Sequence, residues 1–154
     1  MARRHGGEAG TGVEITLAGD IAARAGNGAG SGWHRLRGDQ VGLVFTMLTL
    51  ESERGVTRDA LADAVWPGRM PSAWASALRT LVSQVRTFVG RVVPAPPGGE
   101  VVAARAGRYL LQLPAGSHVD VLAAEAAVAA AQEADPERAL ALATPAVACL
   151  RAPF

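Results

Sequence analysis

The clearest pattern of apolar and polar positions runs from Pro71 to Gly90. Apolar side chains recur there every three or four residues, which is the spacing of one buried face of an α-helix. These apolar residues are Trp74, Ala77, Leu78, Leu81, Val82, Val85, Phe88 and Val89. The polar residues between them are Ser76, Arg79, Thr80, Ser83, Gln84, Arg86 and Thr87. The pattern predicts one long amphipathic helix, capped by Ser72, that packs one face on a core.

The polar face of this predicted helix contains no carboxylate, and no Asp or Glu occurs anywhere from Ala64 to Gly99. A helix face that meets only water usually mixes charges of both signs. Arginines, hydroxyls and an amide instead suit phosphates and base edges. The composition therefore predicts that the helix reads DNA, and the alternative is an ordinary solvated face. The predicted contact residues are Arg79, Thr80, Ser83, Gln84, Arg86 and Thr87.

Three short strands are predicted before the helices. Val13, Ile15 and Leu17 alternate with polar residues, which is the pattern of a strand with one buried face. The segment from Ile21 to Arg24 is its expected hairpin partner, and a further strand is expected at Trp33 to Leu36. The glycines between Gly26 and Gly32 do not open a helix directly after a strand, so they do not form a dinucleotide-binding loop.

Two shorter helices are predicted between these strands and the long helix. Asp39 is the expected N-cap of a helix that ends near Glu51, and Thr57 is the expected N-cap of the next, which Pro67 and Gly68 end. With the long helix they form a compact trihelical unit. The three tryptophans lie beside apolar stripes and are expected to anchor the core: Trp33, Trp66 and Trp74.

A hairpin and two further helices are predicted after the long helix. Ala106 and Gly107 form the expected turn of the hairpin, with Arg105 and Arg108 at its tip, where they are expected to contact DNA phosphates or the minor groove. A domain boundary is expected at Pro114 to Ser117. An alanine-rich helix is expected over residues 119–134, with Asp120 as its cap.

The second of these helices begins with Asp135 and Pro136, because proline favours the first helical position. Pro145 is expected to kink or end it. Two antiparallel helices with small residues at their contact resemble one unit of a helical repeat.

Charge is unevenly distributed along the 154 residues, whose net charge is only +1. Residues 64–116 hold six arginines against one acid, whereas residues 117–154 hold two arginines against five acids. DNA binding is therefore expected of the middle of the chain alone. A lone cysteine, Cys149, excludes a disulfide framework within one chain and fits a reducing cytoplasm.

No enzyme chemistry is predicted from the residues. The sequence shows no nucleophile beside a base, no paired carboxylates in an apolar setting and no cofactor loop. His5, His34 and His118 lack companions at the spacing of metal ligands. Neither an export signal nor a membrane anchor is predicted, so the expected location is cytoplasmic.

The order of strands, three helices and a hairpin is that of a winged helix. Several short segments occur in a characteristic order and spacing: Leu17-Ala18-Gly19, residues 55–61, Val65-Trp66-Pro67, residues 77–80, residues 82–86, residues 107–110 and Val119-Asp120. In these segments the sequence resembles the SARP-type bacterial transcriptional activators. The resemblance implies an α+β fold, in which an OmpR-like winged-helix domain precedes a TPR-like helical bacterial transcriptional activation domain. Residues 1–11 are then a disordered lead, residues 12–115 the winged helix, and residues 116–154 a truncated activation domain.

The resemblance also implies a function. It implies a cytoplasmic activator that binds promoter repeats in double-stranded DNA and contacts RNA polymerase; the loop that holds Arg69 is the expected contact, and an ordinary loop charge is the alternative. Because the chain has few cations, one copy is expected to bind weakly, so we expect binding to direct repeats as a dimer. The family implies no cofactor. This chain departs from it at Gln84, where a cation is common, and at Arg108, where a glycine is usual. These departures leave one alternative, a winged-helix adaptor that binds proteins rather than DNA.

Overall fold

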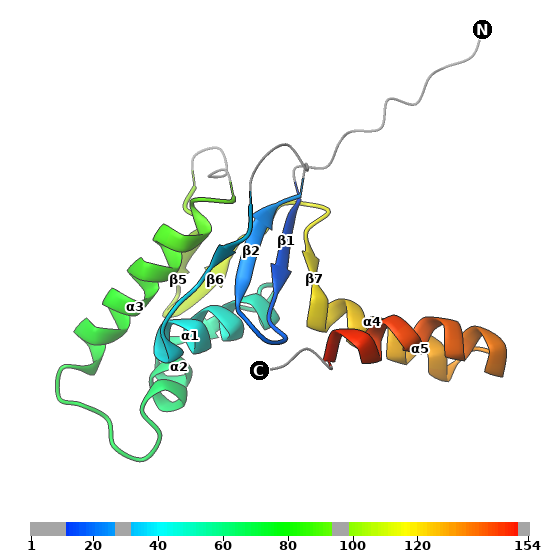
Figure 1. The fold of residues 1–154 in the computed structure, drawn as a ribbon. Coiled ribbons are helices and arrows are strands. Elements are labelled where there is room, and N and C mark those ends of the chain that lie inside the picture. The colour runs from blue at the N-terminus through cyan, green and yellow to red at the C-terminus, as the bar shows by residue number, and fades with distance from the viewer. Residues whose placement is uncertain (1–11, 27–31, 94–98, 151–154) are drawn as a thin grey trace, which may run out of the picture.

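The computed structural model describes residues 12–26, 32–93 and 99–150 (Figure 1). The predicted lead, most of the glycine run between Gly26 and Gly32, and the loop over residues 94–98 lie outside these residues. The described part is a mixed α/β structure with five helices and two sheets. Its mixture of helices and strands agrees with the prediction, but two short strands, Val56–Thr57 and His118–Val119, were not predicted.

The first sheet has the strand order β3-β2-β1-β7. Its strands are β1 (Val13–Thr16), β2 (Ala22–Ala25), β3 (His34–Arg35) and β7 (His118–Val119). The β1–β2 hairpin and the β3 strand confirm the sequence prediction. In contrast, β7 was not predicted, and it pairs in parallel with β1 through Glu14 and Ile15. The Ser117 hydroxyl also accepts a hydrogen bond from the Val13 amide at 3.1 Å, so the segment after the expected boundary is attached to the first strand.

Three helices pack beside this sheet: α1 (Asp39–Leu50), α2 (Arg58–Val65) and α3 (Trp74–Val89). The predicted cap of α2 is confirmed, because the Thr57 hydroxyl accepts a hydrogen bond from the Ala60 amide at 3.1 Å. The other two caps were wrong. Gly38, with a positive φ of 102°, stands at the N-cap of α1, and Ala73 rather than Ser72 stands at that of α3. Neither of these two positions makes a side-chain cap.

The core lies between α1, α3 and the two sheets. Phe45 on α1 meets Phe88 on α3 edge to face, with 5.2 Å between ring centroids. The apolar face predicted for α3 is largely confirmed, since Leu78, Val82, Val85, Phe88 and Val89 are buried.

The tryptophans behave differently from one another. Trp66 and Trp74 are partly buried against the core, as expected. Trp33 is 43 % exposed, so its prediction as a core anchor was wrong. The Arg24 guanidinium lies 4.7 Å from the centroid of the Trp33 ring, and this cation–π contact replaces core packing.

The second sheet has the order β4-β6-β5, with β4 (Val56–Thr57), β5 (Val102–Arg105) and β6 (Arg108–Leu111). The predicted turn is confirmed, because Ala106 and Gly107 have φ angles of 47° and 75°. Positive φ at both central residues is the geometry of the tight hairpin turn that suits twisted strands. The strand β4 was not predicted; it joins the hairpin to the start of α2.

The last two helices, α4 (Asp120–Gln132) and α5 (Pro136–Leu150), lie side by side at the opposite end of the molecule from α3 (Figure 1). Pro136 opens α5 as predicted, and the Asp135 carboxylate accepts a hydrogen bond from the Arg138 amide. Pro145 does not end α5, which continues to Leu150. A TPR-like arrangement of this pair stays a prediction.

The prediction of Asp120 as the cap of α4 was wrong: Val119 stands at the N-cap, without a side-chain cap, and Asp120 is the first residue of the helix. The Asp120 carboxylate accepts hydrogen bonds from the backbone amides of Leu17 at 2.9 Å and Ala18 at 3.2 Å. It therefore fastens the start of α4 to the loop after β1. None of the helices in the described residues is both long and apolar enough to cross a membrane.

Candidate nucleic-acid interface

The polar face of α3 is exposed at five of the six positions predicted to contact DNA. These five residues are Arg79, Thr80, Ser83, Gln84 and Thr87. The sixth, Arg86, is partly buried. The face is exposed because the apolar residues of the same helix turn toward α1 and hold it against the core.

Two hydroxyls of this face, those of Thr80 and Thr87, are anchored to their own helix. Thr80 donates to the Ser76 carbonyl oxygen at 3.2 Å, and Thr87 donates to the Ser83 carbonyl oxygen at 3.1 Å. Such bonds fix the rotamer and leave the hydroxyl oxygen facing outward as an acceptor. The hydroxyls can therefore position an approaching polar group but add no charge.

Arg79 uses one of its donors within the helix and keeps the others. Its Nε donates to the Ala75 carbonyl oxygen at 3.1 Å, and the residue is exposed. In the described part of the chain Arg79 makes no ion pair. Because an arginine carries five N–H donors, its terminal nitrogens stay available for a planar acceptor such as a guanine edge or a phosphate.

Arg86 is held in a different way. Its Nε and one terminal nitrogen donate to the Val102 carbonyl oxygen on β5, at 3.0 and 2.9 Å. The same terminal nitrogen pairs with the Glu100 carboxylate at 3.2 Å. We predicted from sequence that Arg86 faces the bases, but here its guanidinium ties α3 to the hairpin strand. A cation already neutralised by Glu100 adds little to the field that DNA meets.

Three arginines gather at the tip of the β5–β6 hairpin. Arg105 and Arg108 are opposite each other in the antiparallel register, and both are exposed. Arg108 also donates to the Gly55 carbonyl oxygen at 3.2 Å, which steadies its stem. Arg58, at the start of α2, lies over the Tyr109 ring at 5.7 Å. Arg58 was not predicted as a member of this group, because β4, which brings it beside the hairpin, was not predicted.

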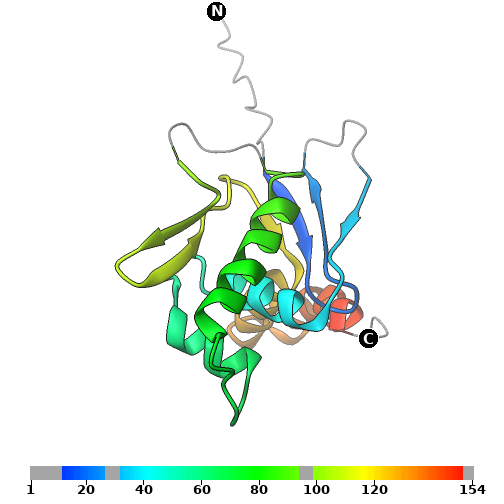
Figure 2. The same cartoon turned by 90° about the vertical axis from the view of Figure 1, so that its left-hand side faces the viewer.

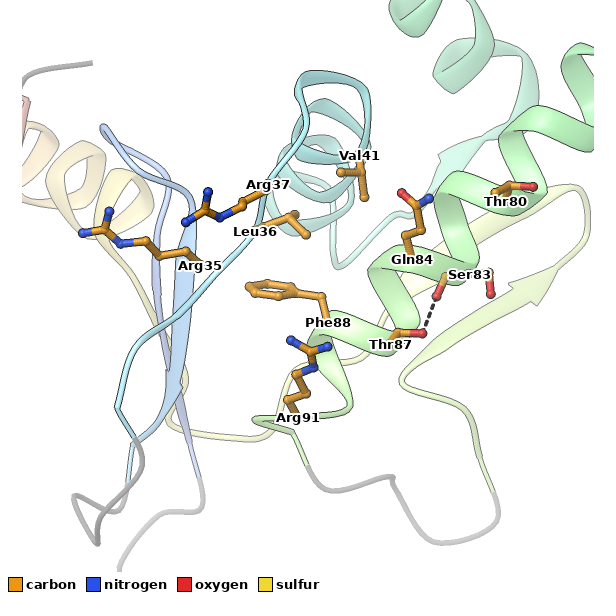
Figure 3. Close-up of a pocket in the computed structure, with 10 residues that line it drawn as sticks. All are labelled: Arg35, Leu36, Arg37, Val41, Thr80, Ser83, Gln84, Thr87, Phe88 and Arg91. Carbon is orange, nitrogen blue, oxygen red and sulfur yellow. Dashed lines mark hydrogen bonds between the residues drawn. The ribbon is translucent and has the colours of Figure 1, made fainter.

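A groove runs along the other flank of α3, between the helix and the segment that links β3 to α1 (Figure 3). Its volume is about 620 Å³. One wall is formed by α3 and by Arg91, two residues beyond its end; the α3 residues are Thr80, Ser83, Gln84, Thr87 and Phe88. The other wall is formed by Arg35, Leu36, Arg37 and Val41.

The arginines of this groove were not predicted from the sequence. Arg35 and Arg37 are far from α3 in the sequence, and Arg91 lies just beyond the predicted helix, so no local pattern joins them. Arg35 is paired with Asp20 at 2.7 Å. Arg37 and Arg91 are exposed and make no ion pair among the described residues. The groove thus carries positive charge beside the polar face of α3.

Two other predicted or possible sites lie away from α3's polar face. Arg69 is exposed in the loop between α2 and α3, and its predicted contact with polymerase stays a prediction.

Cys149 on α5 lies close to Asp120, and partial burial together with the Asp120 carboxylate raises the pKa of its thiol. A thiol with a raised pKa is a poor nucleophile at neutral pH. In the described residues no three His, Cys, Asp or Glu side chains gather as a metal site would require.

Comparison with known proteins finds a likeness among solved structures. No protein-family model matches the chain, and no curated protein matches it. Among solved structures, it is similar to Mycobacterium tuberculosis EmbR in complex with a low-affinity phosphopeptide, with a TM-score of 0.65 and 25 % sequence identity. The match covers 92 % of this chain and 36 % of the EmbR chain. EmbR is a SARP-family transcriptional regulator, so the fold of this chain is similar to that of a SARP-family regulator.

Proposed function

We propose that this protein is a sequence-specific DNA-binding transcriptional regulator in which α3 enters the major groove. The observation that carries the proposal is the exposed polar face of α3, which presents Arg79, three hydroxyl side chains and Gln84 without a carboxylate among them. An α-helix fits the major groove, where each base pair shows a distinct pattern of donors and acceptors. The likeness to EmbR supports a role in regulation.

The residues of the face take different roles under this proposal. Arg79 and Gln84 read base edges, because arginine pairs with guanine and glutamine with adenine through two hydrogen bonds each. The hydroxyls of Thr80, Ser83 and Thr87 position the helix against backbone and bases. Arg86 holds α3 and β5 together through Val102 and so fixes the angle between helix and hairpin.

The β5–β6 hairpin is the wing of the proposed DNA-binding domain. Arg105 and Arg108, with Arg58 beside them, contact phosphates or the minor groove next to the major groove that α3 occupies. With few cations, one copy binds weakly and loses affinity as salt rises. We therefore propose that two copies bind adjacent direct repeats about one helical turn apart.

Activation of transcription is the further part of the proposal. A cytoplasmic activator brings RNA polymerase to the promoter, and here the loop that holds Arg69 is the proposed contact surface. This chain spans 36 % of the EmbR chain that it matches, so the effector steps of that protein are not transferred here.

One observation favours a second function, that of a protein-binding adaptor. The Glu100 carboxylate neutralises Arg86, which leaves Arg79 as the one cation of the α3 face without an ion pair in the described residues. A face with so little charge also suits a protein partner. The adaptor requires no salt-dependent binding to duplex DNA, and this separates the two functions.

The experiment selects preferred duplexes from a random pool and measures their affinity by fluorescence anisotropy at several salt concentrations. We expect salt-dependent binding, and we expect an Arg79→Ala, Gln84→Ala variant to lose about 1–3 kcal/mol of preference for each base pair that these side chains read. The matched control is Arg138→Ala with Gln132→Ala. It removes the same two residue types from exposed positions, Arg138 in α5 and Gln132 at the end of α4. Failure of the pool to yield any preferred sequence would favour the adaptor.

A further inference from the structure

The groove on the flank of α3 opposite the hairpin carries an inference that rests on the proposed function and extends it. We propose that this groove holds the sugar–phosphate backbone of one DNA strand, with Arg37 and Arg91 as its phosphate contacts. The hairpin then contacts the other backbone. The duplex is gripped on both sides of α3 rather than on the hairpin side alone.

The placement of the elements around α3 supports this arrangement. Figure 2 shows α3 facing the viewer, with the β5–β6 hairpin on one side and the first sheet with β3 on the other. The major groove is about 12 Å wide and is bordered by two phosphate backbones. A helix in that groove therefore has one backbone along each flank. A flank without cations would leave one backbone unpaired, and the groove supplies cations on the flank that the hairpin does not reach.

The two walls of the groove bring its cations together. Figure 3 shows Arg91 beside the Phe88 ring on the α3 wall, with Arg37 on the opposite wall. Both guanidinium groups are exposed, and within the described residues neither has a carboxylate partner. Arg35 is the lesser contributor because Asp20 pairs with it at 2.7 Å. Arginine binds phosphate oxygens through two parallel hydrogen bonds, which suits a strand that passes between these walls.

The remaining lining also fits a nucleic-acid backbone. None of the residues that line the groove is a carboxylate, and Asp20, which pairs with the lining residue Arg35, is neutralised by that arginine. The side chains of Leu36, Val41 and Phe88 provide apolar surface that matches deoxyribose. The Thr87 hydroxyl, fixed by its bond to Ser83, provides a further polar contact on the α3 wall. An acidic peptide shares the charge of DNA but not its spacing of one phosphate per nucleotide on each of two strands.

The test compares the wild-type protein with an Arg37→Gln, Arg91→Gln variant on a selected duplex. The slope of log affinity against log salt should become less steep by about 1.8, because each lost phosphate contact removes about 0.9. Sequence preference should stay unchanged, since these residues touch no base. The control variant, Arg54→Gln with Arg138→Gln, removes two exposed arginines away from the groove and should leave the slope unaltered. Unfolding midpoints verify that each variant is folded.

Phosphate ethylation interference locates the contact on the DNA. We expect ethyl groups at phosphates of one strand beside the α3 site to block the wild-type protein but not the double variant. A wild-type protein that binds the duplex while the double variant keeps its full salt slope would overturn this inference and leave the proposed function standing. A wild-type protein that binds no duplex would overturn both. The groove would be assigned to an acidic protein instead if a polyglutamate peptide bound in it while the double variant kept the wild-type slope of log DNA affinity against log salt.

Discussion

Helices α3 and α4 have similar lengths but opposite relations to the rest of the molecule. The first buries five large apolar residues and keeps a polar face in solvent. The second buries Ala124 alone among its residues. The difference follows from the sequence, because α3 places Leu, Val and Phe at helical spacing, whereas α4 is mostly alanine and has no wide apolar stripe.

The two regions also differ in how they are stabilised and in where their charges lie. The unit that contains α1, α2 and α3 has its own core of fully buried residues such as Phe45, Leu61 and Leu78. The α4–α5 pair has little core and is attached through β7 and the Asp120 carboxylate. Its acidic residues lie at the other end of the molecule from α3, so they do not cover the face proposed to read DNA (Figure 1).

The largest expected effect separates the two regions by the same side-chain change. Leu78 on α3 is 1 % exposed, and Leu140 on α5 is 70 % exposed. Leu78→Ala should lower the free energy of unfolding by about 2–5 kcal/mol, since it removes buried area and leaves a cavity. Leu140→Ala should change it by less than about 0.5 kcal/mol. Urea unfolding measures both. Equal losses would mean that the α4–α5 pair shares the core.

A smaller effect is expected at the link between the regions. Asp120→Asn replaces the charged acceptor that holds the Leu17 and Ala18 amides. We expect a loss of about 1 kcal/mol in the free energy of unfolding, because a charge-assisted bond is weakened while the shape is kept. Hydrogen exchange of the two amides should become faster. Asp135→Asn is the control, since that exposed carboxylate accepts from the Arg138 amide of the helix that it precedes and not from another segment of the described chain. Unchanged exchange at Leu17 would show that Asp120 does not fasten the two regions.

The smallest expected effect concerns the charge of the α3 face. Glu100→Gln removes the acid that pairs with Arg86 but keeps the bonds from Arg86 to Val102. We expect DNA affinity at low salt to rise a few-fold, because a repelling carboxylate is lost beside the interface. Stability should stay within about 0.5 kcal/mol, as is usual for an exposed pair. Glu125→Gln on α4 is the matched control. An affinity that falls would mean that the Arg86–Glu100 pair itself sets the angle of the hairpin.

Sequence patterns were sufficient for the local parts of this fold. Residue spacing located α3 to within three residues at its start, and Ala106-Gly107 fixed the hairpin turn. Thr57 marked the start of α2 because a hydroxyl there bonds the third amide onward. Each of these features depends on neighbours within a few positions, which a sequence displays directly.

The parts that the sequence did not reveal depend on distant residues. The strands β4 and β7 have two residues each, and they exist because β6 and β1, which are distant in the sequence, pair with them. Arg86 belongs to the polar stripe of α3 by position, yet the Val102 carbonyl oxygen from β5 holds its guanidinium. The groove cations Arg37 and Arg91 come together only when the segment before α1 lies along α3.

NMR tests directly whether the polar face of α3 contacts DNA. Backbone amide shifts are followed while a selected duplex is added to the protein. The account predicts the largest changes at Thr80, Ser83 and Thr87, smaller ones at the hairpin tip, and none at Ala126 and Ala130 on α4. Changes concentrated on α4 and α5, with α3 unaffected while the duplex is bound, would contradict it.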